Sequence, residues 1–195
     1  MKNCLYVLAT FLLMVFLVSC AVNSIEKPLN PEQKLALNSS AISEIQKLGA
    51  DGDWLVVRKT HATDNMIATF RNAPFSHAAV LDLKKQVVVE SNSKGVHVST
   101  LSQFVGSSHR LMLIRPKWKT PDNQKIALDK AYSLLGKGYD YWGLLGINVD
   151  DKFYCSELAV AIYKPYITKD DSIPKPIAPD QLYIFGKVLY DSGAN

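Results

Sequence analysis

One segment decides how the rest of this chain is interpreted: Phe153-Tyr154-Cys155-Ser156-Glu157-Leu158-Ala159-Val160-Ala161-Ile162-Tyr163. Leu158, Ala159 and Ile162 follow Cys155 at helical spacing, which predicts a short helix with the cysteine on its apolar face. At a helix N-terminus the positive end of the backbone dipole favours the thiolate, and a thiolate is a nucleophile. A cysteine can equally be a small buried hydrophobe. The segment alone leaves both interpretations open.

The N-terminus has the features of an export signal. Met1-Lys2-Asn3 carries a positive charge, and Cys4 to Val18 is an apolar run that is shorter than the roughly 20 residues of a membrane-spanning helix. Leu17-Val18-Ser19-Cys20 resembles the lipobox of bacterial lipoproteins, which implies that Cys20 is the lipid-modified first residue of the mature chain. The alternatives are an ordinary signal peptide cut nearby or a short membrane anchor. Ala21 in place of the retention-type Asp favours the outer membrane, facing the periplasm.

We therefore predict a signal peptide at 1–19, a tether at 20–29 and one domain at 30–195, which is long enough to bury its own core. The formal net charge is only +4 and the basic residues are scattered, which argues against nucleic-acid binding. If Cys20 is acylated, Cys155 has no partner for an intramolecular disulfide. A free thiol in an exported protein then requires burial or catalysis as its explanation.

The hydrophobic patterns predict an α+β domain built on an antiparallel sheet. A long polar loop from Lys59 to Pro74 interrupts them, and loops of that length inside a domain are often functional. The predicted order is a helix at 30–49, strands at 54–58, 76–81, 86–91 and 96–98, a one-turn helix at 100–105, a strand at 110–115, a helix at 120–136, the Cys155 helix ending at Pro165, and a strand at 183–190.

A cysteine nucleophile needs a base within hydrogen-bond reach, and the base needs a third group that orients its ring. The chain has four histidines. His61 and His109 lie in polar segments, and His97 alternates with two valines, so we expect all three to face solvent. His77 begins an otherwise apolar strand, where its side chain can reach over the sheet edge. A structural histidine satisfied by hydrogen bonds is the alternative.

Glu90 is an unexpected carboxylate at the end of the apolar run Val87-Val88-Val89, on the predicted hairpin partner of the His77 strand. A return from a turn near Lys84 would place His77 and Glu90 directly opposite each other as cross-strand neighbours. In that register the carboxylate is close enough to orient the imidazole.

Four fragments together resemble the YiiX/YaeF/YebB-like permuted papain-fold hydrolases, relatives of the NlpC-type cell-wall peptidases and of the lecithin:retinol acyltransferase group. They are Gly52-Asp53-Trp54-Leu55, Phe75-Ser76-His77-Ala78-Ala79, Val89-Glu90-Ser91 and Phe153-Tyr154-Cys155-Ser156-Glu157-Leu158. The resemblance covers roughly residues 48–190. It implies a circularly permuted papain-like domain in which an antiparallel sheet packs against helices, with the histidine strand before the cysteine helix.

Carried over by motif, the resemblance implies Cys155 as nucleophile, His77 as base and Glu90 as the third member of the triad. Tyr139, beside Gly138 and Asp140, is a candidate oxyanion donor; an aromatic residue that packs a loop is the alternative. No cofactor is implied. Cys155 and His77 make only two ligands, too few for a zinc site.

The resulting hypothesis is an envelope-anchored cysteine hydrolase that cleaves an amide bond, peptide or isopeptide, through an acyl-enzyme. Peptidoglycan stem peptides are the nearest polymer to such an anchor. The alternatives are an acyltransferase or a lipid or thioester hydrolase of the same fold, and a catalytically inactive binding lipoprotein. The expected partners are a small peptide, amide or acyl substrate and, through the lipid at Cys20, the membrane.

Overall fold

The computed structural model describes residues 30–59 and 73–193. The predicted signal peptide, Cys20 and the tether up to residue 29 lie outside the described residues, as do His61 and most of the polar loop after Lys59. The described residues from Glu32 onward form one compact unit. Within the described ranges no helix combines the length and the apolar character needed to cross a membrane.

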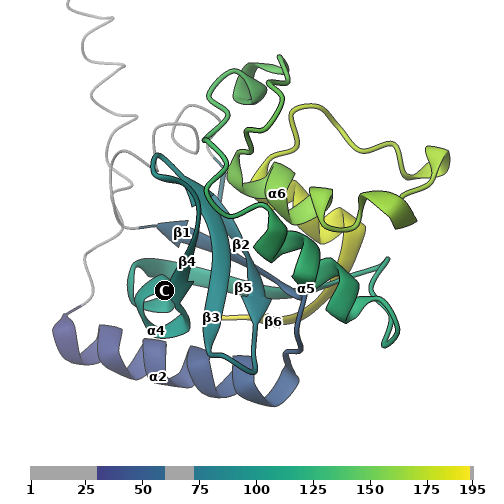
Figure 1. Ribbon diagram of the computed structural model, residues 1–195. Helices are drawn as coiled ribbons and strands as arrows, with labels where there is room; N and C mark the ends of the chain where they lie inside the picture. Colours follow the sequence, from purple (N-terminus) through teal and green to yellow (C-terminus); the bar gives the residue numbers. More distant parts are fainter. Residues whose placement is uncertain (1–29, 60–72, 194–195) are drawn as a thin grey trace, which may run out of the picture. The chain divides into compact units, whose positions relative to one another are not determined.

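A six-stranded sheet runs through the domain, with the strand order β4-β3-β2-β1-β5-β6 and antiparallel pairing between all neighbours (Figure 1). The second, third and fourth strands in sequence form the predicted meander on one side of β1. The strands are β1 (Trp54–Lys59), β2 (His77–Asp82), β3 (Val87–Asn92), β4 (Gly95–Thr100), β5 (Ser108–Pro116) and β6 (Gly186–Asp191).

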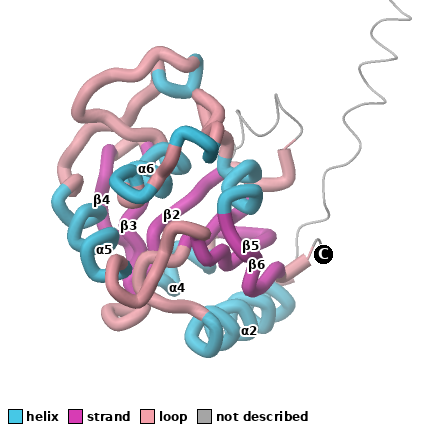
Figure 2. The backbone as a smooth tube through the Cα atoms, turned by 90° about the vertical axis from the view of Figure 1, so that its right-hand side faces the viewer, coloured by secondary structure: helices cyan, strands magenta, loops and turns pink. Residues whose placement is uncertain are grey.

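Helices cover both faces of this sheet (Figures 1 and 2). One face packs against α2 (Pro31–Leu48) and α4 (Leu101–Gly106), and the other against α5 (Gln124–Ser133) and α6 (Cys155–Ala161). Because side chains alternate along a strand, β1 sends Leu55 and Val57 to the first core and Trp54 and Val56 to the second. The short 3-10 helices are η1 (Gly143–Leu145), η2 (Lys164–Tyr166), η3 (Lys169–Asp171) and η4 (Pro179–Phe185).

A buried carboxylate fixes the beginning of β1. Both oxygens of Asp53 accept hydrogen bonds from Arg115, and Lys119 Nζ lies 2.7 Å from Oδ1. Asp53 is fully buried, so these two cations compensate a charge that would otherwise be costly to bury. Asp53 therefore has a structural role, holding β1 to the end of β5.

The α+β class and the antiparallel sheet are confirmed, but several element boundaries differ from the predictions, and the largest differences lie in the second half of the chain. The last strand begins at Gly186, because Tyr183 belongs to η4, a 3-10 helix that buries Leu182 and Phe185 at three-residue spacing. Helix α6 ends at Ala161, and Pro165 lies in η2 beyond it. The helix predicted at 120–136 is limited to Gln124–Ser133.

Candidate active site

Side-chain hydrogen bonds fix the backbone at the start of α6. Ser91 Oγ on β3 donates to the carbonyl of Phe153 at 2.6 Å, and Ser156 Oγ donates to the carbonyl of Ile177 at 2.7 Å. Ser91 and Ser156 are both fully buried, and a buried hydroxyl without a partner is costly. The turn that carries Cys155 is therefore held to the sheet on one side and to the segment before η4 on the other.

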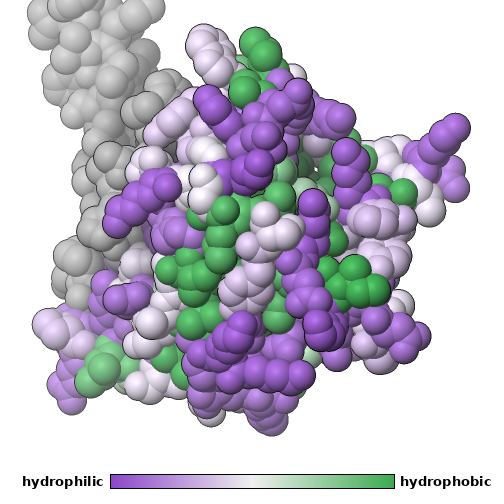
Figure 3. Space-filling model, viewed as in Figure 1, coloured by the Kyte–Doolittle hydropathy of each residue, from purple (hydrophilic) through white to green (hydrophobic). Residues whose placement is uncertain are grey.

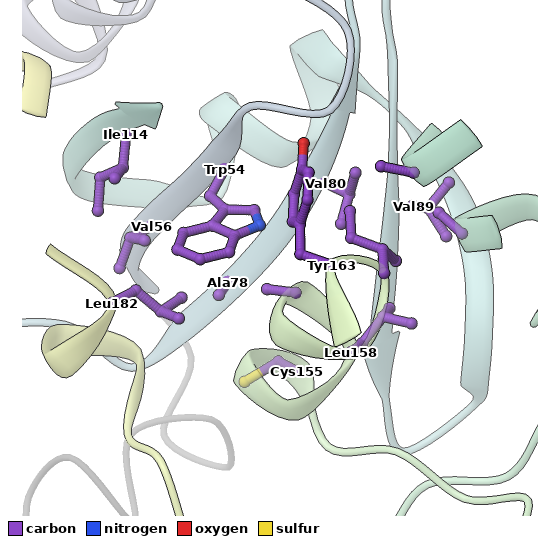
Figure 4. Packing of buried hydrophobic residues seen from close by; sticks show 14 of the residues in the cluster. Trp54, Val56, Ala78, Val80, Val89, Ile114, Cys155, Leu158, Tyr163 and Leu182 are labelled. Atoms are coloured by element: carbon purple, nitrogen blue, oxygen red, sulfur yellow. The ribbon is translucent and has the colours of Figure 1, made fainter. Parts of the chain in front are cut away.

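Cys155 is the first residue of α6 and is only 5% exposed. Figure 4 shows it on the N-terminal turn, with Leu158 and Tyr163 further along the chain in the same core. The predicted apolar face is confirmed, since Leu158, Ala159 and Ile162 are all buried in that core. The thiol of Cys155 is thus buried, and the groups around its sulfur determine its chemical role.

His77 and Glu90 are in direct contact, with His77 Nε2 at 2.6 Å from Glu90 Oε2. Both side chains are buried. The predicted register was wrong by two residues, because Ala79 lies opposite Glu90 and His77 lies one diagonal step away. A two-residue shift keeps both side chains on the same face, so the predicted contact forms across the diagonal.

Cys155 is the second group that interacts with the His77 side chain. Hydrogen bonding between the two side chains contributes to the pKa shifts of both groups. Because Glu90 occupies Nε2, the nitrogen left for the sulfur is Nδ1. His77 is the first residue of β2. Because it lies at the end of the strand, its ring can reach Cys155 on α6, although α6 and α4 pack on opposite faces of the sheet.

Three further polar groups surround the carboxylate of Glu90. Ser99 Oγ donates a hydrogen bond to Oε1, Lys59 Nζ lies 3.7 Å from Oε2, and His97 Nε2 lies 3.7 Å from Oε1. His97 is directly opposite Glu90 on β4. The sequence patterns did not indicate these groups, and the prediction that His97 faces solvent is wrong, because its side chain is only 28% exposed. The turn at Asn92–Gly95, which sets the β3–β4 register, was the signal that could have identified them.

The pKa values of Cys155, His77 and Glu90 are shifted in the directions that favour the charged form of each side chain. Burial opposes ionisation of Cys155, but the charge and hydrogen bond of His77 and the backbone N–H groups of Ala78 and Ser156 outweigh it and lower the thiol pKa. Burial likewise opposes protonation of His77, yet Cys155 and Glu90 raise the imidazole pKa to about 9.

Glu90 stays ionised for the same reason. Burial by itself would raise the pKa of Glu90, but His77, Lys59 and Ser99 lower that pKa to about 2. The three groups therefore form a chain of thiol, imidazole and carboxylate in which the charged forms are favoured. Such a chain provides a nucleophile, a proton carrier and an orienting group within hydrogen-bond reach, which is the arrangement that nucleophilic catalysis requires.

Tyr139 is half-buried, and its ring centroid lies 4.7 Å from that of Tyr141. This packing accounts for the ring, and the oxyanion role of its hydroxyl stays a prediction. In the described ranges no three His, Cys, Asp or Glu side chains are grouped as metal ligands would be.

The fold is also found in a known structure. The metalloprotein YiiX from Escherichia coli O157:H7 superposes with a TM-score of 0.51 at 22% identity, over 62% of this chain and 67% of that one. At this identity the similarity shows the fold alone. A search of the curated proteins found no match.

A family model for permuted papain-like amidases matches residues 49–179, a range that includes β2, β3 and α6 and thus all three members of the polar chain. The order of these elements, with the histidine strand before the cysteine helix, is the permuted order that the sequence predicts. The chain belongs to the permuted papain-like amidases of the YaeF/YiiX type, the C92 family.

Proposed function

We propose that this protein is a cysteine hydrolase that cleaves an amide bond, in a peptide or isopeptide, with Cys155 as nucleophile. The family is one of papain-like cysteine amidases. The observation that carries the proposal is the buried chain from the Cys155 thiol through the His77 imidazole to the Glu90 carboxylate. A cysteine kept for packing alone would need neither the imidazole nor the ionised carboxylate behind it.

In this proposal the Cys155 thiolate attacks the carbonyl carbon of the substrate, and the carbonyl oxygen becomes an oxyanion. His77, protonated on the side that faces the sulfur, donates its proton to the leaving amine as the C–N bond breaks. Water then attacks the acyl-enzyme and gives a proton to His77, and the carboxylic acid and the thiolate are released. Glu90 holds the ring orientation and stabilises the imidazolium through both half-reactions.

The oxyanion would form beside the first turn of α6, where the backbone N–H of Cys155 points away from the helix and has no partner within it. Tyr139 is our candidate for a second donor. The segment Gly138–Asp140 supports this candidate, because Phe153 N–H bonds the carbonyl of Gly138 and so ties that segment to the start of α6.

We further propose that the mature chain is attached to the bacterial envelope by a lipid on Cys20, at the outer membrane and facing the periplasm. The Leu17-Val18-Ser19-Cys20 sequence supports this. Peptides derived from peptidoglycan are the amide substrates that such a location makes accessible, and we propose them as the first substrates to test.

The test is turnover of purified muropeptides and, separately, of phospholipids, by the wild-type protein, Cys155→Ala and His77→Gln. The matched control is His109→Gln, because His109 on β5 forms no hydrogen bond or ion pair with Cys155, His77 or Glu90 among the described residues. We expect muropeptide cleavage that both site variants lose and the control keeps. Turnover of phospholipid alone would refute amide specificity, and turnover unchanged in Cys155→Ala would refute the nucleophile.

A further inference from the structure

The strand β4 passes directly into the helix α4, and this junction lies beside the hydrogen-bonded pair of His77 and Glu90. Ser99 is on β4, Thr100 caps α4, and Phe104 is the fourth residue of that helix. The sequence predicted a one-turn helix here without giving it a role. In the structure, one side chain from each element of the junction contacts a member of the pair.

Ser99 holds the carboxylate oxygen of Glu90 that His77 does not use. Ser99 Oγ donates a hydrogen bond to Oε1, whereas His77 contacts Oε2. Lys59 Nζ and His97 Nε2 each lie 3.7 Å from a carboxylate oxygen, which is beyond ordinary hydrogen-bond distance. Among the described residues, the Ser99 hydroxyl is therefore the only second hydrogen-bond partner of this carboxylate.

The second hydrogen bond fixes the plane of the Glu90 carboxylate. The terminal torsion of a glutamate side chain is only weakly restricted, so a carboxylate held through one oxygen can turn away from the imidazole. With Ser99 on Oε1 and His77 on Oε2, this rotation is blocked. Burial opposes ionisation of Glu90, but His77, Lys59 and the Ser99 hydroxyl together keep the pKa of this carboxyl group at about 2.

The sheet directs Ser99 toward the interior although β4 is an edge strand. Glu90 lies opposite His97 and Val88 lies opposite Ser99, so Ser99 is a diagonal neighbour of Glu90 on the same face. Val98 points to the other face and is 41% exposed. Figure 3 shows hydrophobic and hydrophilic residues mixed over the area where β4 lies in Figure 1.

Phe104 packs against the imidazole ring of His77. The two ring centroids are 5.8 Å apart with 40° between the ring planes, a separation that is usual for contacting aromatic rings. Glu90 holds the imidazole only at Nε2, and the ring torsion of a histidine is broad. Because Phe104 is only 1% exposed, its ring both restricts this rotation and keeps water away from the hydrogen bond.

The turn that joins β4 to α4 is held by its own hydrogen bonds. The N–H of Gln103 donates to Thr100 Oγ1 at 3.2 Å, and the N–H of Thr100 donates to Gln103 Oε1 at 3.3 Å, which is a capping box. The N–H of Leu101 donates to the carbonyl of Gln86 at 2.9 Å and so ties the helix to the turn before β3. These bonds fix where the junction lies relative to β3.

We propose that the β4–α4 junction is a positioning element of the active site, in which Ser99 fixes the carboxylate of Glu90 and Phe104 fixes the ring of His77. The inference rests on the proposed function, because it concerns the same thiol–imidazole–carboxylate chain. Each residue acts through the side chain that it contacts and not through the substrate. The proposal requires a hydroxyl group at position 99 and an aromatic ring at position 104.

The hydroxyl requirement is tested in the complete protein. The measurements are the rate of Cys155 alkylation by iodoacetamide at pH 7, by mass analysis of its peptide, and kcat and KM for an amide substrate. We expect Ser99→Ala to lower the alkylation rate and kcat roughly tenfold at unchanged KM, and Ser99→Thr, which keeps the hydroxyl, to stay within about twofold of the wild type. Ser102→Ala is the matched control, because Ser102 is exposed on α4.

A double variant tests whether Ser99 acts through Glu90. In the Glu90→Gln protein the carboxylate that Ser99 positions is already absent. Adding Ser99→Ala should therefore cause no further loss of alkylation rate. A further tenfold loss, as expected for two independent sites, would mean that Ser99 acts elsewhere and would overturn its assigned role.

The aromatic requirement is tested with Phe104→Leu, which keeps an apolar side chain and removes the ring. We expect the alkylation rate and kcat to fall roughly threefold to tenfold, the range measured for aromatic pairs. Phe185→Leu is the matched control, because Phe185 is a buried ring that stacks on Trp118 in the other core. Urea unfolding of both variants measures their loss of stability. Equal losses of alkylation rate in both would reduce Phe104 to a packing residue and overturn its role.

The remaining outcomes separate this inference from the proposed function. Wild-type alkylation in Ser99→Ala, or alkylation as slow in Ser99→Thr as in Ser99→Ala, would overturn the role of the hydroxyl. If the wild type cleaves no amide while Cys155 alkylation depends on Ser99 and Phe104, the proposed function fails and the positioning element stands. If Cys155→Ala abolishes amide cleavage and changes at Ser99 and Phe104 leave it intact, only the positioning element fails.

Discussion

His77 and Glu90 are hydrogen-bonded across a diagonal of the sheet. Their side-chain atoms Nε2 and Oε2 are 2.6 Å apart, although the residue opposite Glu90 is Ala79. Diagonal neighbours on one face are about 7–8 Å apart at Cα, a distance that only long side chains can bridge. The contact therefore depends on the length of glutamate as well as on its charge.

Shortening or neutralising Glu90 should separate these two requirements. Glu90→Asp keeps the charge but withdraws the carboxylate by about 1.5 Å, and Glu90→Gln keeps the length but loses the charge. We expect both to reduce kcat by on the order of 10²–10⁴, because each leaves the imidazole without an ionised, correctly placed acceptor. Glu44→Gln, at a partly exposed position of α2, is the control for a neutral exchange.

The reduction should appear in the reactivity of the thiol as well as in turnover. Alkylation of Cys155 by iodoacetamide at pH 7, followed by mass analysis of its peptide, measures this directly. A Glu90→Asp protein with wild-type kcat and wild-type alkylation would contradict the diagonal contact as a catalytic requirement.

The pH dependence follows from the two groups that share the proton. The Cys155 pKa is lowered and the His77 pKa is raised to about 9, so the charged pair persists between these two values. Activity should be lost as pH falls through the thiol pKa, which protonates the nucleophile. It should also be lost as pH rises through about 9, because His77 can then no longer supply the proton to the leaving amine.

Alkylation rates and kcat/KM between pH 4 and 10 check this pair of limits. We expect appreciable thiolate reactivity at pH 7, below the ordinary cysteine pKa of about 8.5. The protein unfolded in urea should instead react as a free thiol. An alkylation curve of the folded protein that follows the unfolded one would contradict the ion pair.

Those parts of the site that lie on helices and strands could be predicted from the sequence. The spacing of Leu158 and Ile162 predicted the helix of Cys155, and the carboxylate at the end of an apolar strand singled out Glu90. Because side chains alternate between the two faces of a strand, the pattern placed His77 and Glu90 on the same face of the sheet. This held even though the register between β2 and β3 differs by two residues from the predicted one.

The rest of the site required the three-dimensional packing. Lys59 lies on the same face of β1 as Val57, but it reaches Glu90 on β3 across the intervening strand β2. Sequence spacing does not show that β1 and β3 flank β2. His97 was assigned to solvent because only one face of β4 was considered. In a sheet with helices on both sides the second face is also partly covered.

Lys59 should tune the site through Glu90. Its ammonium group is largely buried, lies 3.7 Å from Oε2 and packs over the Phe104 ring. Lys59→Met keeps the packing and removes the cation, so the pKa of Glu90 should rise and the imidazolium should be less firmly held. We expect kcat to fall about tenfold, the equivalent of one pKa unit, with little change in KM.

The control for this exchange is Lys84→Met, since Lys84 pairs with Asp51 at the exposed turn after β2. The kcat–KM split separates an electrostatic effect from a substrate contact. A rise in KM at constant kcat would mean that Lys59 touches the substrate rather than acting through Glu90.

Glu157 makes the stability of the domain depend on pH in the opposite direction from Glu90. Burial raises the Glu157 pKa from the ordinary 4.5 to about 7 in the folded protein. At pH 4 the group is protonated in both the folded and the unfolded chain and has no differential effect. As the pH rises to about 7, the unfolded chain ionises first, and the free energy of unfolding decreases. Glu157→Gln cannot ionise and should escape this loss.

Urea unfolding of the wild type and Glu157→Gln at pH 4 and pH 8 measures the effect, with Glu44→Gln at a partly exposed position of α2 as the control. The free-energy difference between variant and wild type should grow by about 1 kcal/mol in favour of the variant between the two pH values, a figure that allows for partial solvent screening of this group. Subtracting the pH 4 difference cancels any change in the hydrogen bond from the Tyr154 N–H. A difference that stays constant with pH would mean that the carboxyl group of Glu157 ionises as freely in the folded chain as in the unfolded one, and burial would then not raise its pKa.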